Sequence, residues 1–235
     1  MRPVLSIDRP AGFQVLAVPV LEDNFAFILH RDGVAAVVDP GEAGPVVREL
    51  DARGLRPAAV FVTHSHADHT GGCRGLLDRY GVTAFSPGRE EEREIRLPGI
   101  RCVPLDTPGH TTLHTAWYFP EAEAVFTGDL LINGACGRIF GGTPEALFRS
   151  LRRIAALPPS TRVFGGHDYL AENLRFARAV EPDNPAIARR ERLYAENPAE
   201  ALFPPLSVEQ ESNPFLHASD VETLARLRRR KDRFG

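Results

Sequence analysis

Short blocks of hydrophobic residues alternate with polar turns through the first two thirds of the chain. Apolar runs at residues 14–20, 25–29 and 34–38 are separated by turn-forming residues at 22–24 and 31–33. This pattern predicts successive β-strands that begin as an antiparallel sheet. A helical periodicity at 43–53 ends at Gly54, and a buried strand is expected at 58–62.

A second group of strands follows, and the chain ends in helices. Strands are expected at 83–86, 100–105, 114–119, 124–126 and 163–165, and helices at 72–80, 143–156, 171–180, 185–197 and 219–231. Asp68 is expected to cap the helix at 72–80. Residues 89–96 are expected to form an exposed connection, and the proline-rich residues 197–205 a long one. The pattern predicts an α+β part with layered sheets and helices, residues 1–172, and a helical C-terminal part, residues 173–235.

The composition indicates a globular protein and disfavours binding to nucleic acid or to a membrane. The chain has 235 residues, of which 43% are hydrophobic and 25% charged, and a formal net charge of -3. This is ordinary for a globular protein and offers no positive field for nucleic acid or an anionic membrane. Residues 1–20 lack the pattern of a signal peptide, and no apolar run could span a bilayer. A cytoplasmic protein is therefore expected.

The three cysteines suggest no disulfide framework. Cys73, Cys102 and Cys136 are odd in number and widely spaced. We expect them to be reduced and structural.

Metal-ligating side chains are concentrated directly after the strand at 58–62. The sequence there is Thr63-His64-Ser65-His66-Ala67-Asp68-His69. His110, Asp129 and His167 each follow a glycine near the end of a predicted strand. The candidate ligands are His64, His66, Asp68, His69, His110, Asp129 and His167. A catalytic zinc takes about three protein ligands, so this set predicts two ions that share a carboxylate.

Spacing also separates these candidates from other histidines. On an extended backbone His64 and His66 project to the same side, and Asp68 and His69 at the next turn can face a second ion. The isolated His30 and His217 are interpreted as surface or core residues. His114 is expected to pack against the site or to support a ligand.

The segments that carry the candidate ligands resemble the metallo-β-lactamase superfamily. They lie at 63–69, 107–111, 126–129 and 165–169, in that order. Within that superfamily, residues 135–143, 167–177, 213–216 and 228–234 resemble the hydroxyacylglutathione hydrolases, or glyoxalase II enzymes. The resemblance implies an αββα sandwich with a helical C-terminal domain.

The resemblance also implies a set of metal ligands and a reaction. His64, His66 and His110 would hold one divalent ion, Asp68, His69 and His167 the other, and Asp129 would bridge them. Zinc is the first expectation, and the same ligands also accept iron or manganese. The implied reaction is hydrolysis of S-D-lactoylglutathione to D-lactate and glutathione, in which a hydroxide between the ions attacks the thioester. Asp68 and Asp129 would be the catalytic carboxylates.

A third implication concerns substrate binding. The implied contacts are Arg138, Phe140, Tyr169, Arg228 and Lys231. Phe140 stands where some relatives carry tyrosine, so a hydroxyl contact would be missing, and Arg138 stands where some carry lysine. Charge alone would also fit a solvated helix end for residues 226–233.

Other functions remain open at this stage. A persulfide dioxygenase of the same fold would use a single iron, and a related hydrolase would act on another thioester. A nuclease of the same fold is disfavoured by the acidic balance. A scaffold domain without activity would not need metal-binding side chains. The expected partner is a small-molecule thioester, with no nucleic acid and no membrane, and the oligomeric state is left open.

Overall fold

Two β-sheets form the centre of the molecule. The computed structural model describes residues 2–88 and 94–234. The first sheet has the order β1 (Leu5–Asp8), β2 (Gln14–Val20), β3 (Asn24–Arg31), β4 (Val34–Val38), β5 (Arg56–Phe61), β6 (Thr83–Phe85). The second has the order β13 (Arg162–Gly165), β10 (Ala124–Gly128), β9 (Thr115–Phe119), β8 (Ile100–Asp106), β7 (Ile95–Leu97). The short strands β11 (Leu131–Ile132) and β12 (Ala135–Cys136) form a separate hairpin.

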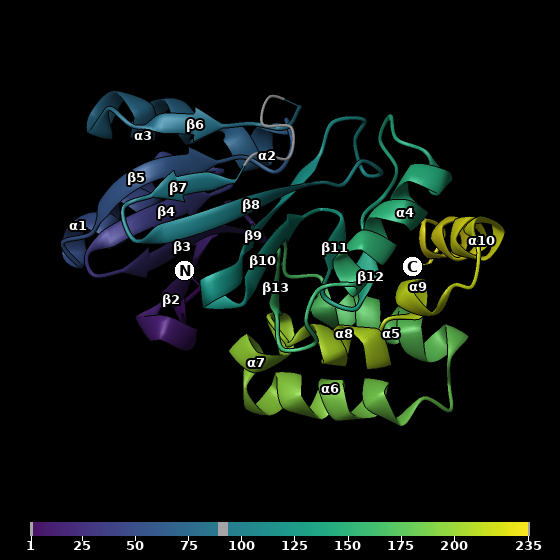
Figure 1. Cartoon of the computed structure of the whole chain (residues 1–235). Helices are drawn as coiled ribbons and strands as arrows, with labels where there is room; N and C mark the ends of the chain where they lie inside the picture. The colour runs from purple at the N-terminus through teal and green to yellow at the C-terminus, as the bar shows by residue number, and fades with distance from the viewer. Residues whose placement is uncertain (1, 89–93, 235) are drawn as a thin grey trace.

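Alternation along the strands creates the layers. Val15 and Phe27 belong to the core between the sheets, whereas their neighbours Leu16 and Ile28 belong to a second core under the outer helices, because successive side chains in a strand point to opposite faces. Helices α1 (Ala43–Ala52) and α3 (Cys73–Tyr80) cover the first sheet, as Figure 1 shows. Helix α4 (Pro144–Ala155) packs with Val125 and Val163 on the outer face of the second sheet. The predicted α+β fold, an αββα sandwich, is confirmed.

The C-terminal part is helical, as predicted. Its elements are α5 (Leu170–Val180), α6 (Pro185–Glu196), α7 (Pro198–Leu202), α8 (Leu206–Ser212), α9 (Pro214–His217) and α10 (Val221–Lys231). They gather at one end of the sandwich (Figure 1). Phe203 stacks on Phe164 of β13, with ring centroids 5.2 Å apart. A boundary after residue 172 would fall inside α5, and this division remains a prediction.

Several local predictions were wrong. Asp68 does not cap the helix at 73–80; it lies in the first turn of the short helix α2 (Ala67–Thr70). Of the expected connection at 89–96, residues 89–93 lie outside the described part, while 95–96 belong to β7, where Ile95 is buried against the core. The expected connection at 197–205 contains α7, which the Asn197 side chain caps. Strand β1 was not predicted.

The carboxyl ends of several strands lie at the same edge of the sandwich. Strands β4 and β5 are parallel, as are β10 and β13, while β8 and β10 both run antiparallel to β9. Strands β2 and β4 likewise both run antiparallel to β3. Parallel strands place their carboxyl ends at the same sheet edge, where ligands commonly bind in open α/β sheets. Among the described residues, no helix has the length and apolar character needed to cross a bilayer.

Candidate metal centre

The seven predicted ligands lie together at this edge. They follow the carboxyl ends of β5, β8, β10 and β13. Three overlapping groups have all their ligand atoms within 4.8 Å of one another: His64, His66 and His110; Asp68, His69 and His167; and His64, His69 and Asp129. The structure therefore brings together every ligand candidate that the sequence indicated.

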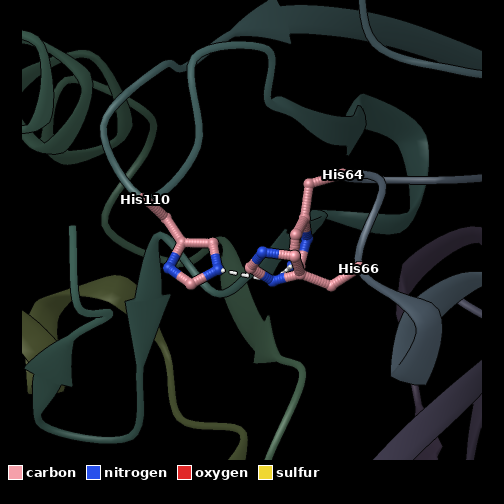
Figure 2. A group of neighbouring side chains, drawn as sticks. All are labelled: His64, His66 and His110. Atoms are coloured by element: carbon pink, nitrogen blue, oxygen red, sulfur yellow. Dashed lines mark hydrogen bonds between the residues drawn. The ribbon is translucent and has the colours of Figure 1, made fainter. Parts of the chain in front are cut away.

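The first group consists of three imidazole nitrogens. Figure 2 shows the rings of His64, His66 and His110 converging from two loops. His66 Nδ1 lies 3.0 Å from His64 Nε2 and 3.1 Å from His110 Nε2. His64 and His110 are buried.

The second group lies beside the first and contains a carboxylate. His69 Nε2 is 3.4 Å from Asp68 Oδ2, and His167 Nε2 is 3.5 Å from the same oxygen. Asn24 donates a 2.9 Å hydrogen bond to that oxygen, which fixes the carboxylate.

Asp129 lies between the two groups. Its Oδ1 is 3.4 Å from His69 Nε2 and 3.3 Å from His167 Nε2, and its Oδ2 is 3.6 Å from His110 Nε2. One oxygen thus faces each group. This arrangement suits a carboxylate shared by two cations.

Glycines allow this close approach. A Cβ on Gly128, which has a φ of 46°, would lie 2.2 Å from Thr63 Oγ1, and one on Gly166 would lie 2.6 Å from His69 Cε1. No side chain fits at either position. The crowding of the loops therefore requires the glycines that precede Asp129 and His167.

Hydrogen bonds on the outer side of the rings orient their inner nitrogens. The Thr63 hydroxyl donates to Asp39 Oδ2 at 2.6 Å, so His64 Nδ1, 3.0 Å from that hydroxyl, must be the donor to it. His69 Nδ1 lies 3.0 Å from Asp39 Oδ2, and His110 Nδ1 2.7 Å from the Arg138 carbonyl oxygen. His167 Nδ1 lies 2.9 Å from Asp23 Oδ1. With the outer nitrogens protonated, each neutral ring turns the lone pair of Nε2 toward the centre.

Asp39 and Asp23 were not found by sequence reasoning. Asp39 is buried and also accepts a 2.7 Å hydrogen bond from the Thr63 backbone N–H. In the sequence it begins Asp39-Pro40-Gly41, which reads as a turn. Its position at the end of β4, next to β5, was the signal that could have identified it.

The donor set fits divalent cations. Bare ring nitrogens 3.0 to 3.1 Å apart repel one another unless a proton or a cation lies between them. His69 Nε2 and Asp129 Oδ1 are buried and have no hydrogen-bond partner. Buried polar atoms are normally satisfied, and imidazole with carboxylate suits zinc, iron or manganese.

Electrostatics favours the same conclusion. Burial lowers the pKa of His64, and His69 lowers it further. Burial alone would raise the pKa of Asp129, but His69 and His167 hold it well below its usual value. Burial alone would lower the pKa of His69, but Asp39 and Asp129 raise it well above 6.5. The ionised carboxylates are therefore stabilised by positive charge between the two ligand groups. A bound metal ion would supply that charge in place of the proton on His69, which would be released.

A cavity opens beside the ligands. Its volume is about 410 Å³, and His110 and Asp129 form part of its wall. All five predicted substrate contacts line it: Arg138, Phe140, Tyr169, Arg228 and Lys231. Tyr169 stacks on His167 with ring centroids 4.7 Å apart, and Phe140 meets the rings of His66 and His110 edge-on.

The two basic residues of α10 in this cavity are buried. Arg228 is 5% exposed and Lys231 7% exposed. Arg228 donates to the Cys136 carbonyl oxygen and pairs with Asp232, while Lys231 pairs with Glu172. A solvated helix end is therefore the wrong interpretation for these two residues, although it holds for Arg226, Arg229 and Arg230, which are exposed.

The remaining histidines and cysteines have other surroundings. His114 is buried, contacts the Thr107 hydroxyl through Nδ1 at 3.0 Å and stacks on His64, which agrees with the expected supporting position. His217 contacts Glu181 on the surface. The three cysteines are free thiols, and burial raises the pKa of Cys136 to about 11, which keeps it uncharged.

Sequence comparisons assign this arrangement to a family. The metallo-beta-lactamase superfamily profile matches residues 21–101 and 87–167, and the profile described as hydroxyacylglutathione hydrolase C-terminus matches residues 168–234. The chain is 40% identical to the hydroxyacylglutathione hydrolase of Methylococcus capsulatus over 94% of its own length and 98% of that relative.

Solved structures show the same fold. The BLEG-1 B3 metallo-beta-lactamase superposes with a TM-score of 0.69 at 20% identity, covering 87% of this chain and 100% of that one. The protein TTHA1623 in a di-iron-bound form superposes with a TM-score of 0.62 at 27% identity, covering 85% and 98%. The chain belongs to the metallo-beta-lactamase superfamily and, within it, to the hydroxyacylglutathione hydrolase family.

Proposed function

We propose that this protein hydrolyses the thioester of S-D-lactoylglutathione, giving D-lactate and glutathione, with two divalent metal ions held by the seven ligands. The observation that carries the proposal is the position of Asp129. Its carboxylate faces both ligand groups and also lines the cavity that contains Arg228 and Lys231. Family relatives that are named hydroxyacylglutathione hydrolases support the substrate class.

The ligand set suits hydrolysis. Two bound cations would lower the pKa of a water and polarise the thioester carbonyl. His64, His66, His110 and Asp68, His69, His167 would hold one cation each, with Asp129 between them. Asp68 stays ionised for this purpose: burial raises its pKa, but the hydrogen bond from Asn24 and the charge of His69 lower it below 3.8.

A thioester needs little help from the protein when its bond breaks. Water first loses one proton, and the resulting hydroxide adds to the carbonyl carbon. The carbon–sulfur bond then breaks with its electron pair on sulfur, which gives a carboxylic acid and a thiolate, and the acid passes its proton to the thiolate to leave a carboxylate and a free thiol. A thiol has a pKa of about 8.5, so the thiolate leaves without a strong general acid. No side chain has to act as the nucleophile.

The cavity suits a substrate whose thiol part, here called the carrier, bears a carboxylate, as glutathione does. Lys231 and Arg228 are buried cations at its wall, and their partners Glu172 and Asp232 are 48% and 40% exposed. The Glu172 and Asp232 side chains can therefore turn into water when a substrate carboxylate replaces them as the partner of Lys231 or Arg228. Tyr169 would donate a hydrogen bond to the carrier, and Phe140 would contact it without a hydroxyl.

The metal and the cellular setting form part of the proposal. Zinc is our first assignment, with iron or manganese as alternatives, and the di-iron-bound relative supports iron as a competent metal in this fold. We place the protein in the cytoplasm, where glutathione thioesters formed from methylglyoxal would be its substrates.

Steady-state assay with S-D-lactoylglutathione tests the proposal. We expect elemental analysis to find two metal ions per chain and turnover that chelator treatment abolishes. No turnover in the fully loaded protein would remove this substrate, and S-acyl derivatives of other thiols would then be assayed. A single iron with oxygen uptake on glutathione persulfide would support the dioxygenase instead.

A further inference from the structure

The hairpin β11–β12 cannot hold its own position. Each strand has two residues, and the turn between them, Asn133-Gly134, has positive φ at both positions, 39° and 82°. Such a turn matches the twist of a hairpin, but an isolated two-stranded hairpin is marginally stable at best. Its placement must come from its surroundings.

Three side chains of the helical part hold its backbone through hydrogen bonds. Both carboxylate oxygens of Glu209 accept from the Gly134 N–H, at 3.1 and 3.0 Å. Asn173 donates to the Ile132 carbonyl oxygen at 3.1 Å, and Asn213 to that of Ala135 at 3.1 Å. These residues come from α5, α8 and the N-cap of α9.

Glu209 is itself fixed by a buried arginine. Arg190 of α6 is 1% exposed and Glu209 0% exposed, and Arg190 Nη2 lies 2.5 Å from Glu209 Oε1. Arg190 also donates to the Ser212 hydroxyl at 3.1 Å and to the Ala201 carbonyl oxygen at 3.1 Å. A buried ion pair gives little net stability, since desolvation offsets its attraction. Its geometry, however, defines where the Gly134 N–H must lie.

The chain on both sides of the hairpin belongs to the metal centre. Asp129 precedes β11 by two residues, and Gly137 and Arg138 follow β12. The Arg138 carbonyl oxygen accepts the hydrogen bond from His110 Nδ1. Gly137 packs tightly against both ligand segments. A Cβ added to it would lie 1.9 Å from the Asp129 carbonyl oxygen and 3.0 Å from His110 Nδ1. A displaced hairpin would therefore move Asp129 and the Arg138 carbonyl together.

We propose that the Arg190–Glu209 pair is a positioning device for the metal centre. Through the Gly134 N–H it sets the hairpin, and through the hairpin it sets Asp129 and the partner of His110. The helical part thereby supports metal binding as well as the substrate cavity. This inference rests on the proposed dinuclear centre but not on the thioester substrate.

Two double variants provide a matched test. Arg190→Met with Glu209→Gln, and Arg190→Met with Glu209→Met, both remove the opposite charges and keep similar volumes. Only glutamine retains an oxygen that can accept from the Gly134 N–H. Replacing both members of a buried pair commonly leaves a protein folded, and circular dichroism with thermal unfolding checks this for each variant.

Metal release and hydrogen exchange are the measurements. In the Glu209→Met double variant we expect metal transfer to a chelator to be faster by about tenfold, the scale for lost supports of metal ligands. We also expect faster amide exchange at 130–138 than in the parent, with β3 and β5 unchanged. The Glu209→Gln double variant should release metal more slowly than the Glu209→Met double variant but faster than the parent, because glutamine keeps the acceptor while the arginine that fixes it is gone.

Equal metal release and equal exchange at 130–138 in the two double variants would overturn the proposal and leave the pair a packing element. If neither double variant folds, Glu209→Asp keeps the negative charge for Arg190 but is one methylene shorter, so it cannot reach both Arg190 and the Gly134 N–H. Unchanged metal release in that variant would also contradict it. Both measurements are made without substrate, so they remain valid if the protein does not cleave lactoylglutathione.

Discussion

The candidate metal centre and the proposed substrate cavity are adjacent but built differently. Four of the five ring ligands have an outer partner within 3.0 Å, and these partners come mostly from strand ends of the sandwich. In the cavity, the Arg138 side chain is 66% exposed and Phe140 53% exposed, and the two buried cations come from the C-terminal helix. In the proposed enzyme, many coupled contacts would therefore fix the groups that carry out hydrolysis, whereas selectivity would depend on a few side chains that can change independently.

The largest effect is expected from Asp129→Asn. The amide keeps the shape but cannot place negative charge between the two ligand groups, so we expect a loss of about a thousandfold or more in kcat. Kinetics with S-D-lactoylglutathione and elemental analysis measure the effect. Asp183→Asn, an exposed aspartate on the surface, is the matched control. A variant with two metals and parental kcat would show that the centre does not depend on a shared carboxylate.

A smaller effect at the centre is expected from Asp39→Asn. Asparagine tolerates the left-handed backbone at this position, where φ is 47°, and keeps one acceptor oxygen. The charge that orients His69 and the Thr63–His64 pair is lost, so metal affinity should fall by about 10- to 100-fold. Competition with a chelator measures it. Parental affinity would mean that the centre is less tightly coupled than the comparison with the cavity suggests.

In the cavity, Lys231→Met should change binding alone. Methionine keeps most of the apolar stem beside Phe176 but removes the charge. We expect KM to rise by about tenfold with kcat nearly unchanged, since binding is lost equally in ground and transition states. Arg226→Met, on the exposed side of the same helix, is the control. A fall in kcat with unchanged KM would place Lys231 in the chemistry and blur the division between the two regions.

The same division explains what the sequence could predict. The candidate ligands could be picked out because they are chemically distinctive and lie at strand ends, and parallel strands bring such ends together. Asp39 was missed because an aspartate before proline and glycine also fits a plain turn, and only strand order reveals its neighbour. Residues Arg190 and Glu209 are 19 apart in sequence, and nothing in the local pattern distinguishes their buried pair from exposed charges on two helices. Strand β7 was missed because the polar residues around Ile95 resemble a loop.

The smallest effect is expected from Phe140→Tyr. The ring of Phe140 lies 5.7 Å from that of His66 and is half exposed, so a hydroxyl can be added without overpacking. If the carrier is glutathione, the added donor should lower KM by about two- to fivefold, the range for one hydrogen bond of about 0.5–1 kcal/mol. Steady-state kinetics on lactoylglutathione, compared with a thioester of a small thiol that lacks the carrier's carboxylates, distinguishes a carrier contact from a general change. A decrease in KM for both substrates would place Phe140 beside the acyl group, and an increase would show that the phenyl ring is itself the preferred contact.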